Sequence, residues 1–541
     1  MERSAHVDSF VRDRLPPREH WPEFLFYLPE LHYRTRLNCA AELLDAAVAA
    51  GHGERVAIVT PSRRLTYREL LTEANRIATV LRDELHLVPG RRVLLRGYND
   101  ALTAACWYAI VKAGCVAVTT MPLLRAIELA EVIEKARVAA ALCDARLAGE
   151  LAAAAASCPS LETTVLFNDD APDALETRMR RHDGSFGNVD TAADDACLIA
   201  FTSGTTGKPK GTVHFHRDVL AICDTFAREH VGATADDLFC GTPPLGFTFG
   251  LGGLLLFPAR SAAATLLLEN AAPETLLAAI EEHSASICFA APTAYRAMTR
   301  IAPAHDLQSL RACISAGEML PPVTRAGWKA ATGIEIVEGI GATEMLHIFI
   351  AASGEAIRPG ATGRPVRGYV AAILDDDGNV LGPGRIGRLA VKGPTGCRYL
   401  ADDRQTQYVQ DGWNVTGDAY LLDDEGYYHY QARTDDMIVS AGYNIAGPEV
   451  EAALLLHGDV RECAVVGVPD ADRGEIVKAF VVLREGVARD DAATAELQRF
   501  VKATIAPYKY PRAIAFVDEL PRTETGKLQR FRLRDAAAGV R

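Results

Sequence analysis

Hydroxyl side chains, glycines and lysines are concentrated in the segment IAFTSGTTGKPKG at residues 199–211. Gly204 and Gly207 allow backbone N–H groups to turn toward an anion, since glycine tolerates positive φ. Lys208 and Lys210 add compact cations that suit phosphate oxygens. Hydroxyl donors in the same segment are Thr202, Ser203, Thr205 and Thr206. The segment therefore predicts a cradle for a polyphosphate.

The spacing of this segment does not fit a Walker A loop. That loop has four residues between its glycines and then Gly-Lys-Ser/Thr, whereas Lys208 is followed here by a proline. Runs of glycine and hydroxyl residues alone are more often flexible surface loops. The apolar stretch ACLIAF at 196–201, however, predicts a strand that leads into an ordered binding loop.

The segment resembles the phosphate-binding signature of the adenylate-forming superfamily, which comprises acyl-CoA synthetases, adenylation domains and firefly-type luciferases. The usual tyrosine at its start is Phe201 here. Further motifs follow in the superfamily's order: ISAGEMLP at 314–321, EGIGATEMLHIF at 338–349, VTGDAY at 415–420, YQARTDD at 430–436 and PRTETGK at 521–527. The resemblance implies ATP and coenzyme A as substrates and Mg²⁺ as the metal.

The resemblance also assigns the residues that contact the nucleotide. Backbone from Gly317 through Glu318 to Met319 is expected beside the adenine, and Asp418 with Arg433 is expected to hold the ribose hydroxyls. A carboxylate that accepts two hydroxyl protons suits a vicinal diol. An aspartate in V-T-G-D on its own would more often be a turn residue.

The catalytic roles implied by the resemblance fall to Thr343, Glu344 and Lys527. Glu344 and Thr202 would supply hard oxygen ligands for Mg²⁺, and Lys527 would bridge the substrate carboxylate and the α-phosphate. Fixed cations lower the barrier when negative charge builds on phosphoryl oxygens. A lone glutamate, or a lysine near a terminus, is otherwise usually a solvated charge.

Helical and strand-like apolar patterns alternate along the chain, for example a helix at 67–85 followed by a strand at 115–120. This alternation predicts an α/β fold with largely parallel sheets. We expect a large N-terminal domain at residues 1–434, with a small β-rich subdomain, and a small mobile α+β domain at 435–541. The resemblance implies a hinge at Asp435, which would end the last strand of the large domain together with Asp436. It also implies a close passage of the pantetheine arm at Gly442.

The acid-binding residues follow from a closer resemblance to bacterial benzoate-CoA and 2-aminobenzoate-CoA ligases. These residues are Phe247, Gly339, Ile340, Gly341, Met345, Leu346 and His347. Many relatives have tyrosine where Ile340 stands. His347 has two equally weighted interpretations: a hydrogen-bond partner for an ortho substituent, or a satisfied core histidine. The glycine-flanked rings at 241–258 predict a slot for a small flat ligand.

The predicted function is therefore an ATP-dependent ligase that joins a small aromatic carboxylic acid to coenzyme A, with 2-aminobenzoate favoured over benzoate and salicylate. One alternative is an adenylation enzyme that loads an aryl acid onto a separate carrier protein. Residues 243–253 contain no charge, which disfavours α-amino acids. A nucleotide-binding regulator without turnover would need neither Glu344 nor Lys527, and a luciferase-type oxygenase has no supporting feature.

Composition narrows the partners and the compartment. The formal net charge of −13 over 541 residues disfavours nucleic acid and anionic membranes. The twelve cysteines include no C-x-x-C pair and are expected to be reduced core residues rather than disulfides or a zinc site. The charged N-terminus lacks the apolar core of a signal peptide, and we expect a cytoplasmic protein, monomeric or homodimeric.

A histidine pair follows the cradle in the sequence HFHRD, which contains His214, His216 and Asp218. An acyltransferase base or an H-x-H metal pair are alternatives, but neither comes with further ligands at suitable spacing. We expect Asp218 to cap the following helix.

Overall fold

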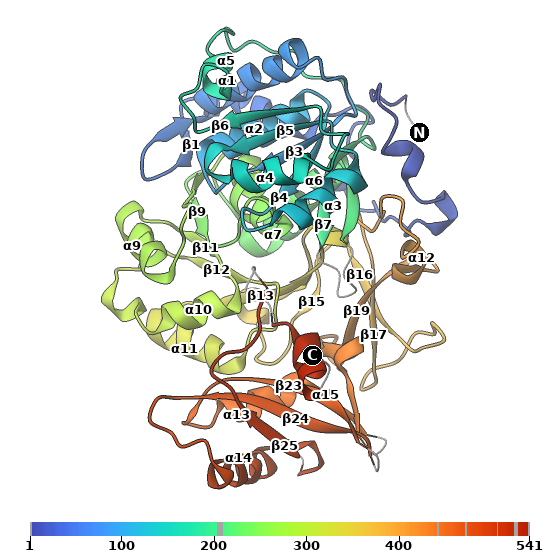
Figure 1. Cartoon of the computed structure of the whole chain (residues 1–541), viewed down its shortest axis with the longest axis vertical. Helices are drawn as coiled ribbons and strands as arrows, with labels where there is room; N and C mark the ends of the chain where they lie inside the picture. Colours follow the sequence, from blue (N-terminus) through green and yellow to red (C-terminus); the bar gives the residue numbers. More distant parts are fainter. Residues whose placement is uncertain are drawn as a thin grey trace.

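The computed structural model of the chain describes residues 3–202, 209–440, 443–470, 473–505, 507–523 and 528–538, without the side chains of residues 435, 439, 443, 444 and 538. Figure 1 shows three sheets in the upper and middle parts and a fourth at the C-terminal end. The predicted fold class, a large N-terminal domain with helices on mixed sheets and a smaller C-terminal domain, is confirmed.

The first sheet leads the chain to the predicted cradle. Its strands, in spatial order, are β6 (Thr163–Phe167), β5 (Ala140–Asp144), β3 (Arg92–Arg96), β4 (Val116–Thr120), β7 (Ala196–Thr202) and β8 (Lys210–Phe215). Neighbouring strands are parallel except for the last pair, which is antiparallel. The inner strands read as continuous apolar runs because helices cover both faces of a parallel sheet.

Helices from the N-terminal part of the chain cover this sheet. They are α1 (Tyr67–Thr79), α2 (Ala101–Lys112), α3 (Ala126–Ala136), α4 (Ala148–Ala155), α5 (Leu175–Met179) and α6 (His216–Ile222). α1 begins at a capping box, in which the Thr66 hydroxyl accepts from the Glu69 N–H and the Glu69 carboxylate accepts from the Thr66 N–H. α2 is buried on all sides, which explains its uniformly apolar sequence.

The second sheet has nine strands. In spatial order they are β15 (Arg364–Pro365), β14 (Ile348–Ala351), β13 (Ile336–Gly341), β12 (Ala312–Ser315), β11 (Ile287–Phe289), β9 (Leu238–Gly241), β10 (Ala264–Leu266), β1 (Val56–Val59) and β2 (Arg64–Thr66). The strands from β13 to β1 are parallel, and the two edges are antiparallel. Associated helices are α7 (Thr248–Leu251), α8 (Phe257–Arg260), α9 (Pro273–His283), α10 (Pro292–Thr299) and α11 (Pro322–Thr332).

The third sheet is antiparallel throughout and confirms the predicted β-rich subdomain. It comprises β16 (Val370–Leu374), β17 (Ile386–Lys392), β18 (Val409–Gln410), β19 (Trp413–Leu422) and β20 (Tyr428–Arg433), with α12 (Gln405–Tyr408) alongside. β20 ends at Arg433, and a short 3₁₀ helix, Thr434–Asp436, leads into the next sheet. The expectation that Asp435 and Asp436 end the strand was therefore wrong by two residues, because the chain turns as soon as it leaves its β19 partner.

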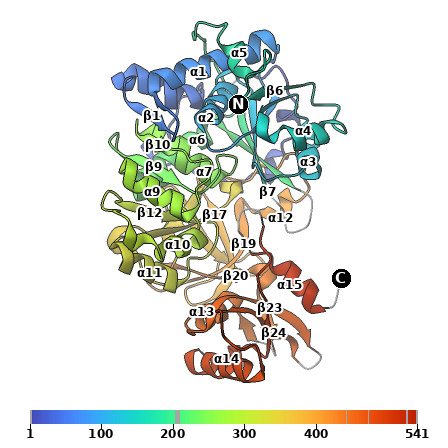
Figure 2. The same ribbon diagram turned by 60° about the vertical axis from the view of Figure 1, so that its left-hand side comes forward.

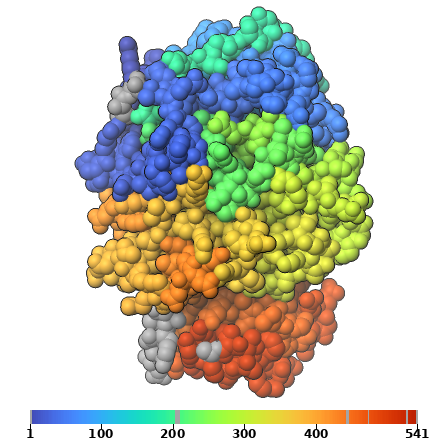
Figure 3. Space-filling model, turned by 180° about the vertical axis from the view of Figure 1, so that it is seen from behind, coloured from blue at the N-terminus to red at the C-terminus, as the bar shows by residue number. Residues whose placement is uncertain are grey.

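The C-terminal sheet packs below the third sheet, as the red segments in Figures 2 and 3 show. It contains β21 (Ile438–Ser440), β22 (Tyr443–Ile445), β23 (Val460–Asp470), β24 (Gly474–Leu483) and β25 (Ala513–Phe516), with α13 (Gly447–Leu455), α14 (Asp491–Thr504) and α15 (Arg530–Ala538). Its own apolar core includes Val450, Leu454 and Val481, so it can fold as a separate unit. None of the helices in the described part of the chain combines the length and hydropathy that crossing a bilayer would require.

Candidate active site

The predicted cradle lies at the end of the β7–β8 hairpin. Thr202 pairs with Lys210 where the two strands separate. The predicted residues between them, Ser203, Gly204, Thr205, Thr206, Gly207 and Lys208, lie outside the described residues. The Thr202 hydroxyl oxygen is buried without a hydrogen-bond partner in the described part of the chain. A buried polar oxygen of this kind costs free energy unless a ligand satisfies it.

Glu344 lies beside this hairpin, on the short 3₁₀ helix Thr343–Met345 that contacts β7. Oε1 of Glu344 accepts a 2.5 Å hydrogen bond from the Tyr399 hydroxyl, and Lys210 Nζ lies 3.8 Å from the same oxygen. The Lys210 ammonium also lies 5.0 Å from the centre of the Tyr399 ring. The structure therefore brings Glu344 together with Lys210 and with Tyr399, a tyrosine that sequence reasoning missed.

Leu346, which lies between Glu344 and His347 in the sequence, has a strained backbone conformation. Leu346 has a φ of 68°, a conformation that costs a residue with a Cβ about 1–3 kcal/mol. Its side chain is fully buried, which holds the residue in this conformation. A hydrogen bond fixes the backbone of Thr343: its carbonyl accepts from His214 Nε2 at 2.8 Å.

The predicted ribose residues face each other on adjacent antiparallel strands. Asp418 on β19 is in register with Arg433 on β20, and Asp418 Oδ1 lies 3.2 Å from Arg433 Nη1. Arg433 Nη1 also donates to the Thr416 carbonyl at 3.2 Å. The pair is therefore fixed by the sheet register, while the Arg433 side chain keeps 39% of its surface exposed for a ligand.

The predicted adenine loop, with Gly317, Glu318 and Met319, contacts the C-terminal domain. Gly317 has a φ of 93°, which favours glycine. Glu318 Oε1 lies 3.9 Å from Nη1 of Arg522. Arg522 pairs with Leu528 in an isolated antiparallel bridge, and Leu528 directly follows Lys527 in the sequence. Lys527 itself lies outside the described residues, as does Gly442.

His347 is buried among aromatic rings. Its ring centroid lies 5.3 Å from Phe226, 5.6 Å from Phe249, 4.6 Å from Phe257 and 6.4 Å from Phe289. Neither ring nitrogen makes a hydrogen bond of normal geometry in the described structure. Burial lowers the pKa of His347 to about 3, outweighing the opposite effect of the Phe249 backbone, so the imidazole is neutral. A satisfied core histidine is therefore not what the structure shows.

The other predicted acid-pocket residues lie around the same region. Phe247 and Ile340 are half-buried, Met345 and Leu346 are fully buried, and Gly341 is exposed. At Gly339 an added Cβ would come 2.6 Å from Ile348 Cγ2 on the paired strand β14, so a larger residue would require the Ile348 side chain to move. A cavity of about 10 Å³, lined by residues that include Leu245, Gly246 and Trp107, holds no more than a water molecule. None of the predicted acid-pocket residues lines it, so this cavity is not the predicted slot.

Asp218 in the HFHRD segment caps α6, as predicted. Its carboxylate accepts a hydrogen bond from the Phe215 N–H at 2.9 Å. Asp218 also forms a fully buried ion pair with Arg398, which the sequence did not indicate. His214 and His216 do not act as a pair. His214 bonds to Thr343, whereas His216 contacts Cys39.

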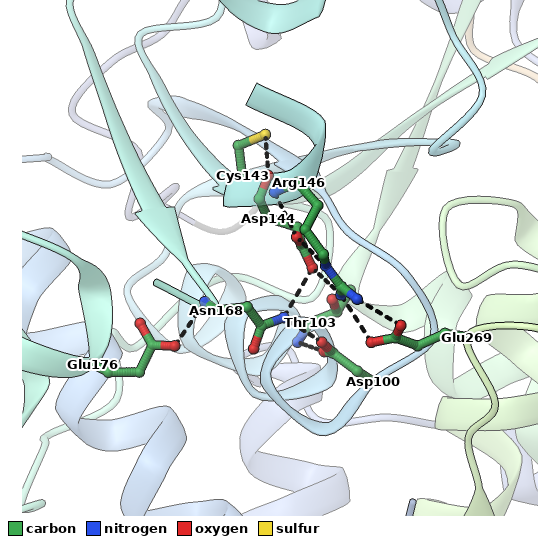
Figure 4. A network of polar contacts seen from close by, with 8 residues as sticks. All are labelled: Asp100, Thr103, Cys143, Asp144, Arg146, Asn168, Glu176 and Glu269. Carbon is green, nitrogen blue, oxygen red and sulfur yellow. Dashed lines mark hydrogen bonds and ion pairs between the residues drawn. The ribbon is translucent and has the colours of Figure 1, made fainter. Parts of the chain in front are cut away.

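A larger cavity of about 640 Å³ lies between the first two sheets. Figure 4 shows the polar network along its wall. Arg146, after β5, makes two-pronged contacts with Asp144 at 2.6 and 2.9 Å and with Glu269, after β10, at 2.7 and 2.8 Å. Asn168 Nδ2 joins Asp144 and Asp100 at 2.8 and 2.6 Å. Through Arg146 and Glu269 the network connects the segment after β5 in the first sheet to the segment after β10 in the second.

Comparison with known proteins shows the family to which the chain belongs. Residues 45–399 match the AMP-binding enzyme family, and residues 449–527 match the AMP-binding enzyme C-terminal domain. The benzoate–CoA ligase of Thauera aromatica is 35% identical over 514 residues, covering 94% of this chain and 98% of that protein. The 4-hydroxybenzoate–CoA/benzoate–CoA ligase of Rhodopseudomonas palustris is 32% identical, covering 93% and 94%.

Two solved structures are similar over nearly the whole chain. The anthranilate CoA ligase AuaEII in complex with anthranoyl-AMP has a TM-score of 0.89 at 32% identity, covering 94% of this chain and 99% of that one. The benzoate CoA ligase from Burkholderia xenovorans has a TM-score of 0.84 at 31% identity, covering 92% and 100%. The chain belongs to the AMP-binding enzyme family, and so to the adenylate-forming superfamily that its motifs predicted.

Proposed function

We propose that this protein is an AMP-forming ligase that joins a small aromatic carboxylic acid of the benzoate and 2-aminobenzoate type to coenzyme A. Membership of the AMP-binding enzyme family and the similarity to aryl-CoA ligases support the reaction class. The observation that carries the aromatic assignment is the neutral His347 among four phenylalanine rings, because these rings suit a flat apolar ring.

The orphan nitrogens of His347 support a substrate with a polar substituent. A buried nitrogen without a partner costs about 1–3 kcal/mol. An ortho amino or hydroxyl group on the acid would supply that partner. Half-buried Phe247 and Ile340 are the proposed gate through which the acid enters.

The first proposed step joins the acid to AMP. A carboxylate oxygen attacks the α-phosphorus of ATP, the bond to the bridging oxygen breaks, and pyrophosphate leaves with the electron pair. No general base is needed, since the acid is already ionised at neutral pH. The cradle at 202–208 would hold the β- and γ-phosphates, Lys527 would contact the carboxylate and the α-phosphate, and Asp418 with Arg433 would hold the ribose.

The oxygen donors in this region fit Mg²⁺. Thr202 offers an unpartnered hydroxyl, and Glu344 offers a carboxylate on the helix against the same strand. When bound, the ion would neutralise charge on the phosphates. Tyr399 and Lys210 would hold the Glu344 carboxylate in place.

The second proposed step transfers the acyl group. The thiolate of coenzyme A attacks the acyl carbon, the acyl–phosphate bond breaks, and AMP leaves. We propose that the domain at 435–541 turns about Asp435, withdrawing Lys527 and presenting Gly442 to the pantetheine arm. The placement of Asp435 in the short segment between the third and fourth sheets supports this hinge. The proposed compartment is the cytoplasm, in keeping with twelve unpaired cysteines.

A pyrophosphate-release screen over benzoate, 2-aminobenzoate, salicylate, 4-hydroxybenzoate, phenylacetate and medium-chain fatty acids, with and without coenzyme A, tests the proposal. We expect the benzoates to be the best substrates and the thioester to form with coenzyme A. Pyrophosphate release with aryl acids but no thioester would favour the carrier-loading alternative. Preference for fatty acids would refute the aromatic assignment.

A further inference from the structure

Three buried side chains that take no part in the proposed reaction lie close together. Cys39 begins the helical segment that follows Asn38, Cys197 lies on β7, and His216 is the first residue of α6. One sulfur or nitrogen atom from each lies within 4.8 Å of the other two, and all three residues have no exposed surface. Within the described ranges this is the one such group of histidine, cysteine and carboxylate side chains.

Hydrogen bonds fix the protonation of the histidine. The Cys39 N–H donates to His216 Nδ1 at 3.1 Å, so Nδ1 carries the lone pair and the ring proton lies on Nε2. Cys39 Sγ lies 3.2 Å from the same Nδ1. A neutral imidazole is the form that binds a metal ion. Because the Nδ1 lone pair accepts the Cys39 N–H, an ion bound at Nδ1 would replace that hydrogen bond.

The charges of the proposed ligands indicate the class of ion that they would bind. Two thiolates and a neutral imidazole carry a charge of −2, which a divalent ion cancels. A neutral cluster is the least costly in a fully buried site, whereas a monovalent ion would leave a net charge. Soft sulfur ligands select zinc among the common divalent ions.

The spacing fits zinc after a small movement. Zn–S and Zn–N distances of about 2.3 and 2.05 Å at a tetrahedral angle separate sulfur from nitrogen by about 3.6 Å. The Cys39 Sγ to His216 Nδ1 distance of 3.2 Å would have to open by a few tenths of an ångström. Metal uptake would release the two thiol protons to solvent.

We propose that Cys39, Cys197 and His216 form a structural site for a zinc-type divalent metal ion. The site joins the N-terminal helical segment to β7, the first strand of the cradle hairpin, and to α6, which follows the second strand. No C-x-x-C pattern marks this site, because the three ligands lie 158 and 19 residues apart in the sequence. The prediction that the cysteines do not form a zinc site is replaced by this proposal.

A second set of cysteines provides a matched control. Cys240, Cys288 and Cys313 lie in register on β9, β11 and β12 and are equally buried, but no histidine joins them in a group of the required spacing in the described structure. Cys240→Ala therefore removes a buried thiol without removing a proposed ligand.

The test uses the full chain, unfolded with chelator and reductant and refolded with Zn²⁺ or Cd²⁺. Bound metal is measured by elemental analysis after gel filtration, and Cd–thiolate absorption is recorded. We expect about one ion per chain and a higher Tm than in the chelated protein, for both wild type and Cys240→Ala. Cys39→Ser and Cys197→Ser should lose the ion and the absorption, and His216→Asn should weaken binding.

Circular dichroism of the chelated variants separates loss of metal from loss of fold. Refolded wild type without bound metal, or metal retained in both serine variants, would overturn the proposal. So would a Cys39–Cys197 disulfide in the isolated protein that excludes the ion.

Discussion

The Tyr399 hydroxyl donates a 2.5 Å hydrogen bond to the Glu344 carboxylate, and the two residues come from loops 55 positions apart in the sequence. Lys210 lies 3.8 Å from the same carboxylate oxygen. The carboxylate is therefore held by a donor and a cation on the side next to the cradle, in a place where it is almost fully buried.

Glu344→Gln should weaken the use of Mg-ATP, because an amide oxygen is a poorer ligand than a carboxylate. We expect the Mg²⁺ concentration for half-maximal pyrophosphate release to rise about tenfold or more. Tyr399→Phe should lower kcat/KM by about tenfold, since it removes one hydrogen bond to a charged group. Glu355→Gln, on the exposed turn after β14, is the control. Unchanged magnesium dependence in Glu344→Gln would remove Glu344 from the metal site.

Arg433→Lys and Asp418→Asn should each raise KM for ATP by about tenfold, with a smaller effect on KM for the acid. The reason is that the strand register holds both groups beside the proposed ribose position, and a lysine lacks the planar fork of arginine. Initial rates at varied ATP measure this, with Asp424→Asn on the exposed β19–β20 turn as the control. If KM for ATP stays at the wild-type value in both variants, the ribose assignment is wrong.

His347→Phe should change substrate choice rather than general activity. Phenylalanine keeps the aromatic packing but cannot form a hydrogen bond. We expect kcat/KM for 2-aminobenzoate to fall about tenfold to a hundredfold relative to benzoate. Competition between the two acids gives the ratio directly. A ratio equal to that of wild type would mean that His347 does not contact the ortho substituent.

Stability toward acid should depend on the same histidine. The pKa of His347 falls from 6.5 in the unfolded chain to about 3 in the fold, so between these values the unfolded chain binds the extra proton. The free energy of unfolding therefore decreases as pH falls from 6.5 toward 3. His6, with a pKa lowered by burial to about 4, acts in the same direction.

His347→Phe should flatten this dependence by up to about 1.4 kcal/mol per pH unit between pH 6 and 4. Urea unfolding at several pH values measures the slope, and exposed His20→Gln is the control. A variant as acid-sensitive as wild type would show that His347 is not buried in its neutral form.

Most of the fold could be predicted because each element carries a local pattern. The sequences of α2 and of β7 (ACLIAF) are almost entirely apolar, and this composition predicts that both elements are buried. The end of β20 was misplaced by two residues, because strand ends depend on the partner strand rather than on the residues themselves.

The residues of the candidate site also fall into two groups: those that the sequence predicts and those that only the structure reveals. Thr202, Glu344, Asp418 and Arg433 lie in contiguous motifs and were found from the sequence. Tyr399, Arg398 and three of the rings around His347 were not, because only tertiary packing brings them to the site. The cluster of Cys39, Cys197 and His216 was missed for the same reason.

Arg522 pairs with Leu528, the residue after Lys527, and lies 3.9 Å from Glu318 in the predicted adenine loop. We propose that Lys527 brings a cation to the nucleotide for the first step and leaves before the second.

The most direct test compares the two half-reactions in Lys527→Ala, with Lys502→Ala on exposed α14 as the control. We expect formation of the acyl-adenylate to fall by about a hundredfold to a thousandfold, while transfer of a supplied aryl-adenylate to coenzyme A stays near the wild-type rate. An equal loss in both half-reactions, or no loss in the first, would contradict the account.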